Sequence, residues 1–140
     1  MSFDPGLSPD DYQVTDPILT ALGEERGWGV GSTEYLISEW IALVRELEEE
    51  YRLEVYEYEN ELDGRQILEV LVPRLPPVLA LRVRQVLEPW DRRFNEATVP
   101  VNESLCTPTL EEPGLWCYRA PKRFNEEVAS SLQQWLRGGS

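Results

Sequence analysis

The chain of 140 residues contains no histidine, only two cysteines, and half as many basic as acidic residues. Without histidine it lacks the side chain that most often acts as a general base near neutral pH, and also the commonest zinc ligand. Cys106 and Cys117 are too few for a disulfide scaffold. Both lie in one C-terminal segment, so two alternatives stay open: a pair of free thiols in a reducing compartment, or a bridge that closes one loop.

Long apolar runs are also absent. No stretch approaches the roughly 20 apolar residues of a membrane-spanning helix. The N-terminal sequence MSFDPGLSPDDYQ has neither the basic region nor the apolar centre of a signal peptide. We therefore expect a cytoplasmic protein.

Basic charge is scarce, with 13 lysines and arginines against 26 aspartates and glutamates, a formal net charge of −13. This charge disfavours direct binding to nucleic acid and to anionic membranes. It favours a basic protein partner, because long-range attraction speeds association. The alternative explanation is that the charge serves solubility alone.

The segment from Thr33 to Glu59 organises the rest of the predicted fold. Ser32 or Thr33 can cap a helix, and the apolar residues that follow recur at spacings of three and four, which is typical of an amphipathic helix. These residues are Leu36, Ile37, Trp40, Ile41, Val44 and Leu47. We expect this helix to pack on a sheet, with Trp40 as its anchor in the core.

From Tyr51 the pattern changes to a period of two, which predicts a strand over residues 51–59. Strict alternation places two tyrosines on one face and a row of glutamates on the other. The tyrosines are Tyr56 and Tyr58, and the glutamates are Glu57, Glu59 and Glu61.

The boundaries of the other elements are predicted from proline, glycine and capping residues. Asp16-Pro17 starts a short helix that ends near Gly23 or Gly27, and residues 27–32 form a glycine-rich link with Trp28 against the core. Residues 64–72 favour a short helix, although Asp63-Gly64 is also typical of a hairpin turn. The helix from Pro77 should kink or split after Leu87, because Pro89 lacks an N–H group.

The C-terminal part predicts a strand at residues 98–101, a long loop at 102–114, a strand at 115–120 and a helix from Asn125. The whole pattern indicates an α+β fold: a small sheet of three, possibly four, largely antiparallel strands with helices packed mainly on one face. We expect one domain at residues 15–137, a flexible segment at 1–14 and a frayed end at 138–140.

Four arginines, Arg82, Arg84, Arg92 and Arg93, make the helix after Pro77 the most basic part of the chain. The first interpretation is that they pair with glutamates of the 33–49 helix. The second is a separate basic binding face.

No pattern indicates catalysis, a cofactor or a metal site. Carboxylates are plentiful, but a carboxylate-based hydrolase is the least favoured alternative, because nothing places two of them across a cleft. We therefore expect a non-enzymatic binding protein, with an immunity protein that inhibits a nuclease-type toxin as one concrete case. The predicted partner-binding residues are Glu54, Tyr56, Glu57, Tyr58, Glu59, Glu61 and Asp63.

Two other interpretations of the sequence remain open. The acidic cluster is also typical of a solvated strand edge that charge protects from aggregation. A structural or accessory subunit, monomeric or self-associating, would use exposed aromatic residues, for which Trp28, Trp90 and Trp116 are the candidates.

Overall fold

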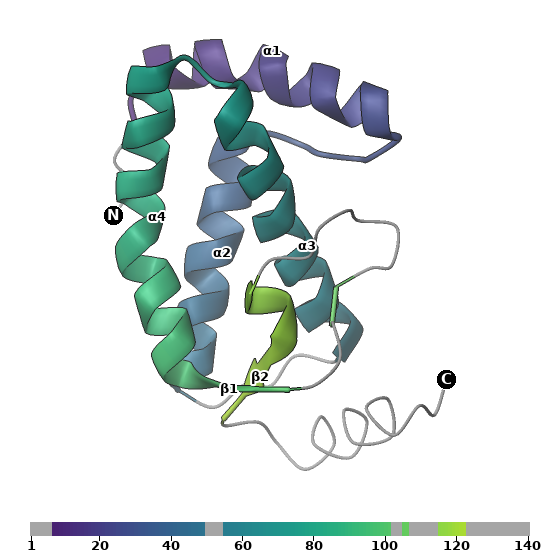
Figure 1. Ribbon diagram of the computed structural model, residues 1–140, viewed down its shortest axis with the longest axis vertical. Coiled ribbons are helices and arrows are strands. Elements are labelled where there is room, and N and C mark those ends of the chain that lie inside the picture. Colours follow the sequence, from purple (N-terminus) through teal and green to yellow (C-terminus); the bar gives the residue numbers. More distant parts are fainter. Residues whose placement is uncertain (1–6, 50–54, 102–104, 107–114, 123–140) are drawn as a thin grey trace.

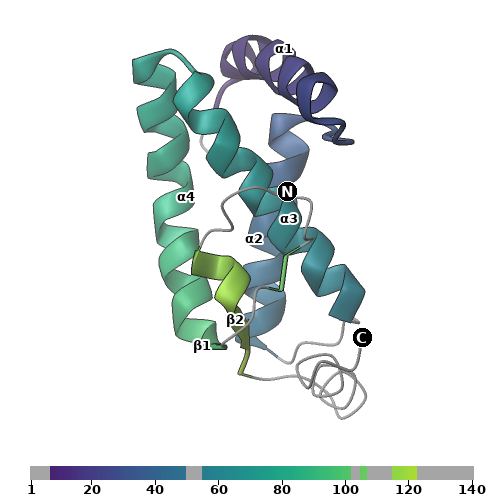
Figure 2. The same cartoon turned by 45° about the vertical axis from the view of Figure 1, so that its right-hand side comes forward.

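The computed structural model describes residues 7–49, 55–101, 105–106 and 115–122. This part of the chain forms four helices: α1 (Pro9–Arg26), α2 (Thr33–Glu48), α3 (Val55–Leu71) and α4 (Pro77–Ala97). Helices α2, α3 and α4 run lengthwise beside one another, and α1 crosses one end of them (Figure 1). The turned view in Figure 2 shows the same crossing of α1 and the same layer of three helices.

The predicted α+β fold with three or four strands is wrong. Within the described residues the only sheet has two short strands, β1 (Thr98–Pro100) and β2 (Arg119–Pro121), which pair antiparallel with Val99 opposite Ala120. Helix α2 therefore buries its apolar stripe against α3 and α4 instead of a sheet. The core is a helix-on-helix core, and the described helices include none that is long and apolar enough to cross a membrane.

Helix α1 begins at Pro9 and not at Pro17, so residues 9–14 are helical. Ser8 forms a capping box with Asp11, and Pro17 lies inside the helix. The carboxylate of Asp16 accepts a hydrogen bond from the Thr33 backbone N–H at 2.9 Å, so Asp16 caps the start of α2 instead of its own helix.

Helix α2 confirms the amphipathic prediction. The Ser32 side chain accepts a hydrogen bond from the Tyr35 N–H at 3.1 Å, which satisfies one free donor of the first turn. Every residue of the predicted stripe is buried, and Trp40 is only 1% exposed. The Trp40 indole N–H donates to Asp91 in α4 at 2.9 Å, so this anchor is hydrogen-bonded as well as packed.

Helix α3 contradicts the strand predicted over residues 51–59, since residues 55–59 are helical; residues 51–54 lie outside the described part. The helix predicted at 64–72 is confirmed as the second half of α3, and the hairpin alternative is wrong. Its buried positions follow a helical spacing, but a charged residue, Arg65, stands in the middle of them. The positions at this spacing are Tyr58, Leu62, Arg65, Leu68 and Leu71.

The remaining elements are close to their predicted places. A 3₁₀ turn, η1 (Val72–Arg74), links α3 to α4, and α4 continues through Pro89 without splitting. Strand β1 confirms the predicted strand, but residues 115–118 form a second 3₁₀ turn, η2 (Leu115–Tyr118), ahead of β2. The helix predicted from Asn125, the frayed end at 138–140 and most of the 102–114 loop lie outside the described residues.

Candidate binding cleft

The predicted partner-binding residues do not form one row. Glu54 lies outside the described residues, and Tyr56, Glu57 and Glu59 belong to the first part of α3, with side chains outside the described structure. Tyr58 is buried, and its hydroxyl donates to the Arg119 carbonyl oxygen. Burial raises the pKa of this hydroxyl well above its ordinary value. Tyr58 therefore attaches α3 to β2 and is not available to a partner at the surface.

Glu61 and Asp63 line a cleft of about 500 Å³ between the α1–α2 linker, α2 and α3. This volume lies within the range of roughly 300–1,000 Å³ that ligand sites occupy. The described lining is mainly apolar or glycine, and it also includes three carboxylates. It consists of Gly27, Trp28, Gly29, Val30, Gly31, Tyr35, Leu36, Glu39, Asn60, Glu61, Asp63, Gly64 and Ile67.

Two glycines set the walls of this cleft. A Cβ atom at Gly23 of α1 would lie 2.9 Å from the Trp28 carbonyl oxygen, so the missing side chain lets the linker pack directly on α1. A Cβ atom at Gly64 would lie 3.4 Å from Leu36 Cδ2, so the missing side chain opens the space where α3 faces α2. The linker confirms the predicted glycine-rich connection, with Trp28 half-buried against the core.

Among the described residues that line the cleft, three carry carboxylates and none is a lysine or an arginine, so this part of the lining is acidic. Glu61 and Asp63 are two residues apart in α3, which separates them by about 160° around the helix axis at roughly 100° per residue. Asn60 and Gly64 occupy the helix face between them, so the two side chains leave α3 in nearly opposite directions. Glu39 adds the third carboxylate from α2, one turn after Tyr35, whose side chain is 57% exposed.

The sequence interpretation missed Tyr35, Glu39 and the linker as parts of this site. Tyr35 and Glu39 are four residues apart beside the apolar stripe of α2, which indicates a shared exposed edge. That spacing was a usable signal, and its position next to a glycine-rich segment made it stronger. The sequence pattern does not reveal that α3 lies opposite this edge, because it predicts a strand over residues 55–59.

The arginines of α4 do not form the separate basic binding face that was the second interpretation of the sequence. Each has a carboxylate partner: Arg82 pairs with Asp11, Arg84 with Glu69, Arg92 with Glu88, and Arg93 with Glu48. Only Arg93 pairs with α2 as predicted. A hydrogen bond from Arg93 lowers the pKa of Glu48 below its ordinary value.

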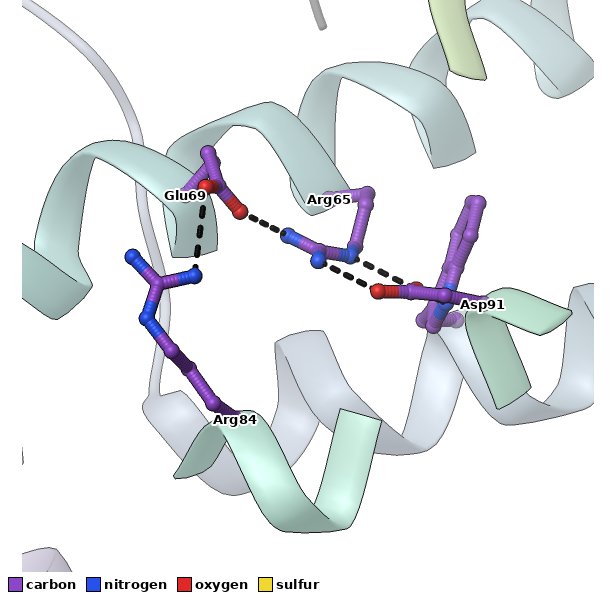
Figure 3. Close-up of polar contacts among 5 residues, drawn as sticks. Arg65, Glu69, Arg84 and Asp91 are labelled. Carbon is purple, nitrogen blue, oxygen red and sulfur yellow. Dashed lines mark hydrogen bonds and ion pairs between the residues drawn. The ribbon is translucent and has the colours of Figure 1, made fainter. Parts of the chain in front are cut away.

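An ion-pair network centred on buried Arg65 lies between α3 and α4 (Figure 3). Arg65 is 4% exposed and donates to Asp91 through two nitrogens, at 3.0 and 2.7 Å, and to Glu69 at 3.0 Å. Its guanidinium also lies 4.3 Å from the ring centroid of Trp116. Because every charge in this network has a partner inside the protein, we interpret it as structural.

The three tryptophans proposed as exposed candidates are partly buried against the core. Each also lies against a guanidinium, Trp28 with Arg26, Trp90 with Arg45 and Arg93, and Trp116 with Arg65. These contacts cover the rings with polar groups of the same molecule.

Cys106 and Cys117 form a disulfide, which decides between the two alternatives left open by the sequence. Within the described ranges, no group of three or more acidic or cysteine side chains is placed to hold a metal ion. Comparison of the chain with protein-family models, curated proteins and solved structures finds no match. The geometry of the described residues therefore carries the functional argument.

Proposed function

We propose that this protein is a non-enzymatic binding protein that engages a basic protein partner at the cleft. The observation that carries the proposal is the composition of the cleft: among the described residues that line it, apolar side chains and glycines predominate, Glu39, Glu61 and Asp63 are acidic, and none is basic. Carboxylates accept strong charge-assisted bonds from arginine and lysine, and exposed Tyr35 supplies aromatic contact area. The net charge of −13 adds long-range attraction for the same partner.

An inhibitor of a nuclease-type toxin is the concrete case we favour. A nuclease site is positively charged because it binds phosphates, and carboxylates at the cleft would occupy the place of those phosphates. Two observations bear on the compartment of the protein, and they differ. The sequence predicts the cytoplasm, whereas a disulfide such as Cys106–Cys117 is typical of an oxidising compartment.

The test is capture of a partner from the native lysate at low salt and again at about 0.5 M salt, where the Debye length is only a few ångströms. Wild type would be compared with Glu61→Gln/Asp63→Asn, which removes two charges from the cleft while keeping side-chain size. The matched control is Glu88→Gln/Glu96→Gln, which removes two exposed charges from α4, outside the cleft.

The expected result is one basic protein that wild type and the α4 control retain at low salt and the cleft variant loses. Cross-linking followed by peptide mapping should place that protein next to Tyr35 and Glu61. Equal capture by all three proteins, or loss in both variants alike, would mean that net charge and not the cleft binds the partner.

A self-associating or accessory subunit remains the second candidate, and one observation favours it. Val78 and Leu81 of α4 are 67% and 57% exposed, and Val14 of α1 is 43% exposed. The Arg82–Asp11 ion pair joins α1 and α4 at this end, so the three apolar side chains lie on neighbouring elements. A molar mass that rises with concentration, and falls back to the monomer in Leu81→Asp, would support this candidate.

A further inference from the structure

The 3₁₀ turn η2 forms part of the wall of an aromatic cavity. Its Trp116 side chain lines a cavity of about 200 Å³ together with Trp40 of α2 and Phe94 of α4. Trp40 and Phe94 are each only 1% exposed. The Trp116 ring also lies 4.3 Å from the Arg65 guanidinium. A movement of η2 away from the helices would therefore open this cavity toward solvent.

The indole N–H of Trp116 opposes this position of η2. It is buried and has no hydrogen-bond partner among the described residues, whereas the Trp40 N–H donates to Asp91. A buried donor without an acceptor costs free energy, because it has lost its hydrogen bond to water. Release of η2 would return the Trp116 donor to water. The closed position of η2 must therefore be held by other contacts.

The Cys106–Cys117 disulfide is the covalent link that holds η2. Beside it, the Leu105 N–H donates to the Cys117 carbonyl oxygen at 2.6 Å. At the end of η2, the Val101 N–H donates to the Tyr118 carbonyl oxygen at 2.8 Å. Breaking the disulfide would leave η2 with the contact of its tryptophan ring and with single hydrogen bonds, each of modest net strength.

Strand β2, which follows η2, is attached to the helices without help from the disulfide. The Arg119 carbonyl oxygen accepts a hydrogen bond from the Tyr58 hydroxyl, and the Arg119 guanidinium donates to Thr98 Oγ1 at 2.7 Å. The Lys122 N–H donates to the Ala97 carbonyl oxygen at 3.1 Å. Because these bonds hold residues 119–122, a release of η2 would stop at the start of β2.

We propose that η2 is a redox-sensitive strap: reduction of the Cys106–Cys117 bond releases Trp116 from Arg65 and opens the aromatic cavity, while the four helices stay folded. The reductant is a dithiol. One of its thiolates attacks a sulfur and the S–S bond breaks; the second thiolate then displaces the mixed disulfide. Two electrons and two protons pass to Cys106 and Cys117, which become thiols, and the reductant becomes a disulfide. The strap is independent of partner binding at the cleft, so either proposal can fail alone.

Burial of the disulfide makes its reduction depend on the opening of η2. Cys106 is 4% exposed and Cys117 is 0% exposed, so a thiolate reaches either sulfur only after the strap has lifted. This opening can be local, limited to η2, or it can require unfolding of the whole domain. The two routes respond differently to urea, because the sensitivity to urea scales with the surface that becomes exposed.

The first measurement is the rate at which dithiothreitol reduces the full-length protein at urea concentrations below the unfolding transition. Local opening predicts a rate that changes by less than about twofold over this range. A rate that rises in parallel with the equilibrium constant of unfolding would mean that the disulfide becomes accessible only when the whole fold is lost. The proposed strap would then be wrong.

The second measurement compares NMR signals before and after both cysteines have become thiols. The signals of the Trp116 indole N–H and the Cys117 amide should move toward their positions in an unfolded chain, while the Ile37 and Leu43 amides of α2 keep theirs. The variant Cys106→Ser/Cys117→Ser should show the released positions without reductant and should not respond to reductant. An unmoved Trp116 signal, or loss of the α2 signals together with it, would contradict the strap.

Discussion

Arg65 connects several elements of the structure. It belongs to α3 and bonds with Asp91 of α4 (Figure 3), and its guanidinium lies 4.3 Å from the ring centroid of Trp116 in η2. A buried guanidinium with good partners is not strong evidence for added stability, because its desolvation offsets most of the attraction. The alignment of α3 against α4 in the structure brings Asp91 and Glu69 within hydrogen-bonding distance of the three nitrogens of Arg65.

Removing one partner of this network should be costly. We expect Asp91→Leu to lower the free energy of unfolding by about 2–3 kcal/mol, because buried Arg65 keeps Glu69 as its one carboxylate partner among the described residues and the buried Trp40 N–H loses its acceptor. This value is at the lower end for a buried pair, since the Asp91 side chain is about one third exposed. The double variant Arg65→Met/Asp91→Leu should lose less than Asp91→Leu alone. Urea denaturation measures both.

The matched control is the ion pair between Arg92 and Glu88 in α4, whose side chains are 63% and 70% exposed. Glu88→Gln should change stability by less than about 0.5 kcal/mol. If Asp91→Leu were as mild as this control, Arg65 would have to be solvated, and its place as a structural centre would be wrong.

Tyr58 gives a second prediction at the residue scale. Tyr58→Phe keeps the buried ring and removes the hydrogen bond to the Arg119 carbonyl oxygen, so stability should fall by about 1–2 kcal/mol. Partner capture should stay unchanged, because the hydroxyl lies inside the protein. If the variant instead had normal stability but no longer captured the partner, Tyr58 would belong to the binding surface, as the sequence predicted.

At the scale of the element, the sequence was sufficient for α2 and insufficient for α3. The stripe of α2 is continuous and its cap is local, so propensity, capping and burial agree. In α3 the same spacing is interrupted by buried Arg65 and Gln66, and Gly64 stands in the helix interior. Those departures depend on Asp91 and Leu36, which are distant in sequence, so local reasoning could not anticipate them.

Gly23 and Gly64 are both inside helices, and the same substitution should have opposite effects on them. Alanine at a helix interior is favoured over glycine by about 1 kcal/mol. Gly64→Ala should realise part of this gain, because its Cβ atom would only touch Leu36. Gly23→Ala should destabilise the protein, because its Cβ atom would lie 2.9 Å from the Trp28 carbonyl oxygen and from Val30 Cγ2.

Thermal unfolding of the two variants checks this pair, with each serving as control for the other. Gly23→Ala should also perturb the amide signals of Gly29 and Gly31, since the linker must move away from α1. Equal stabilisation in both variants would show that the linker is not packed on α1 as described.

The Cys106–Cys117 disulfide ties Cys106 to the 3₁₀ turn η2, which stands in place of the first part of the predicted strand at 115–120. Both cysteines are buried, and the bond closes a loop with a sequence separation of 11 residues. Loop-closure entropy for a loop of this size corresponds to about 3 kcal/mol. The variant Cys106→Ser/Cys117→Ser should therefore unfold at lower urea, by an amount near this value. Wild type in reductant should unfold at a similarly lowered urea concentration. Wild type without reductant should yield no reactive thiol in the native state.

At the scale of the whole molecule, the sequence correctly predicted an acidic chain with one strong amphipathic helix, but not its architecture. Two of the seven predicted site residues, Glu61 and Asp63, line the cleft, and Tyr58 is inside the core. The cleft depends on the position of the α1–α2 linker, which lines it together with α2 and α3. That position is set by Gly23 and by the Asp16–Thr33 bond, both contacts that composition and periodicity do not reveal.

The absence of histidine makes a prediction about pH for the whole molecule. No side chain of the folded protein has an ordinary pKa between about 6 and 8, because the cysteines are joined in a disulfide. Stability should therefore be nearly constant over this range, apart from a small contribution of the terminal amine. Urea midpoints measured in steps from pH 3 to pH 8 would check this, and a clear transition near pH 7 would contradict it.

Below that range the sign of the change follows from three carboxylates. Hydrogen bonds from Ser8, Arg74 and Arg93 lower the pKa values of Asp11, Glu25 and Glu48 in the folded state. Groups with lowered pKa values stabilise the fold above their unfolded values, near 4, and lose this contribution as the pH falls through their folded values. Stability should thus drop below about pH 4.

At pH 7, by contrast, added salt should raise stability, because it screens repulsion within a chain of net charge −13. The salt effect should shrink near pH 4.5, where part of that charge is neutralised; an unchanged salt effect would show that repulsion among the acidic residues does not limit this fold.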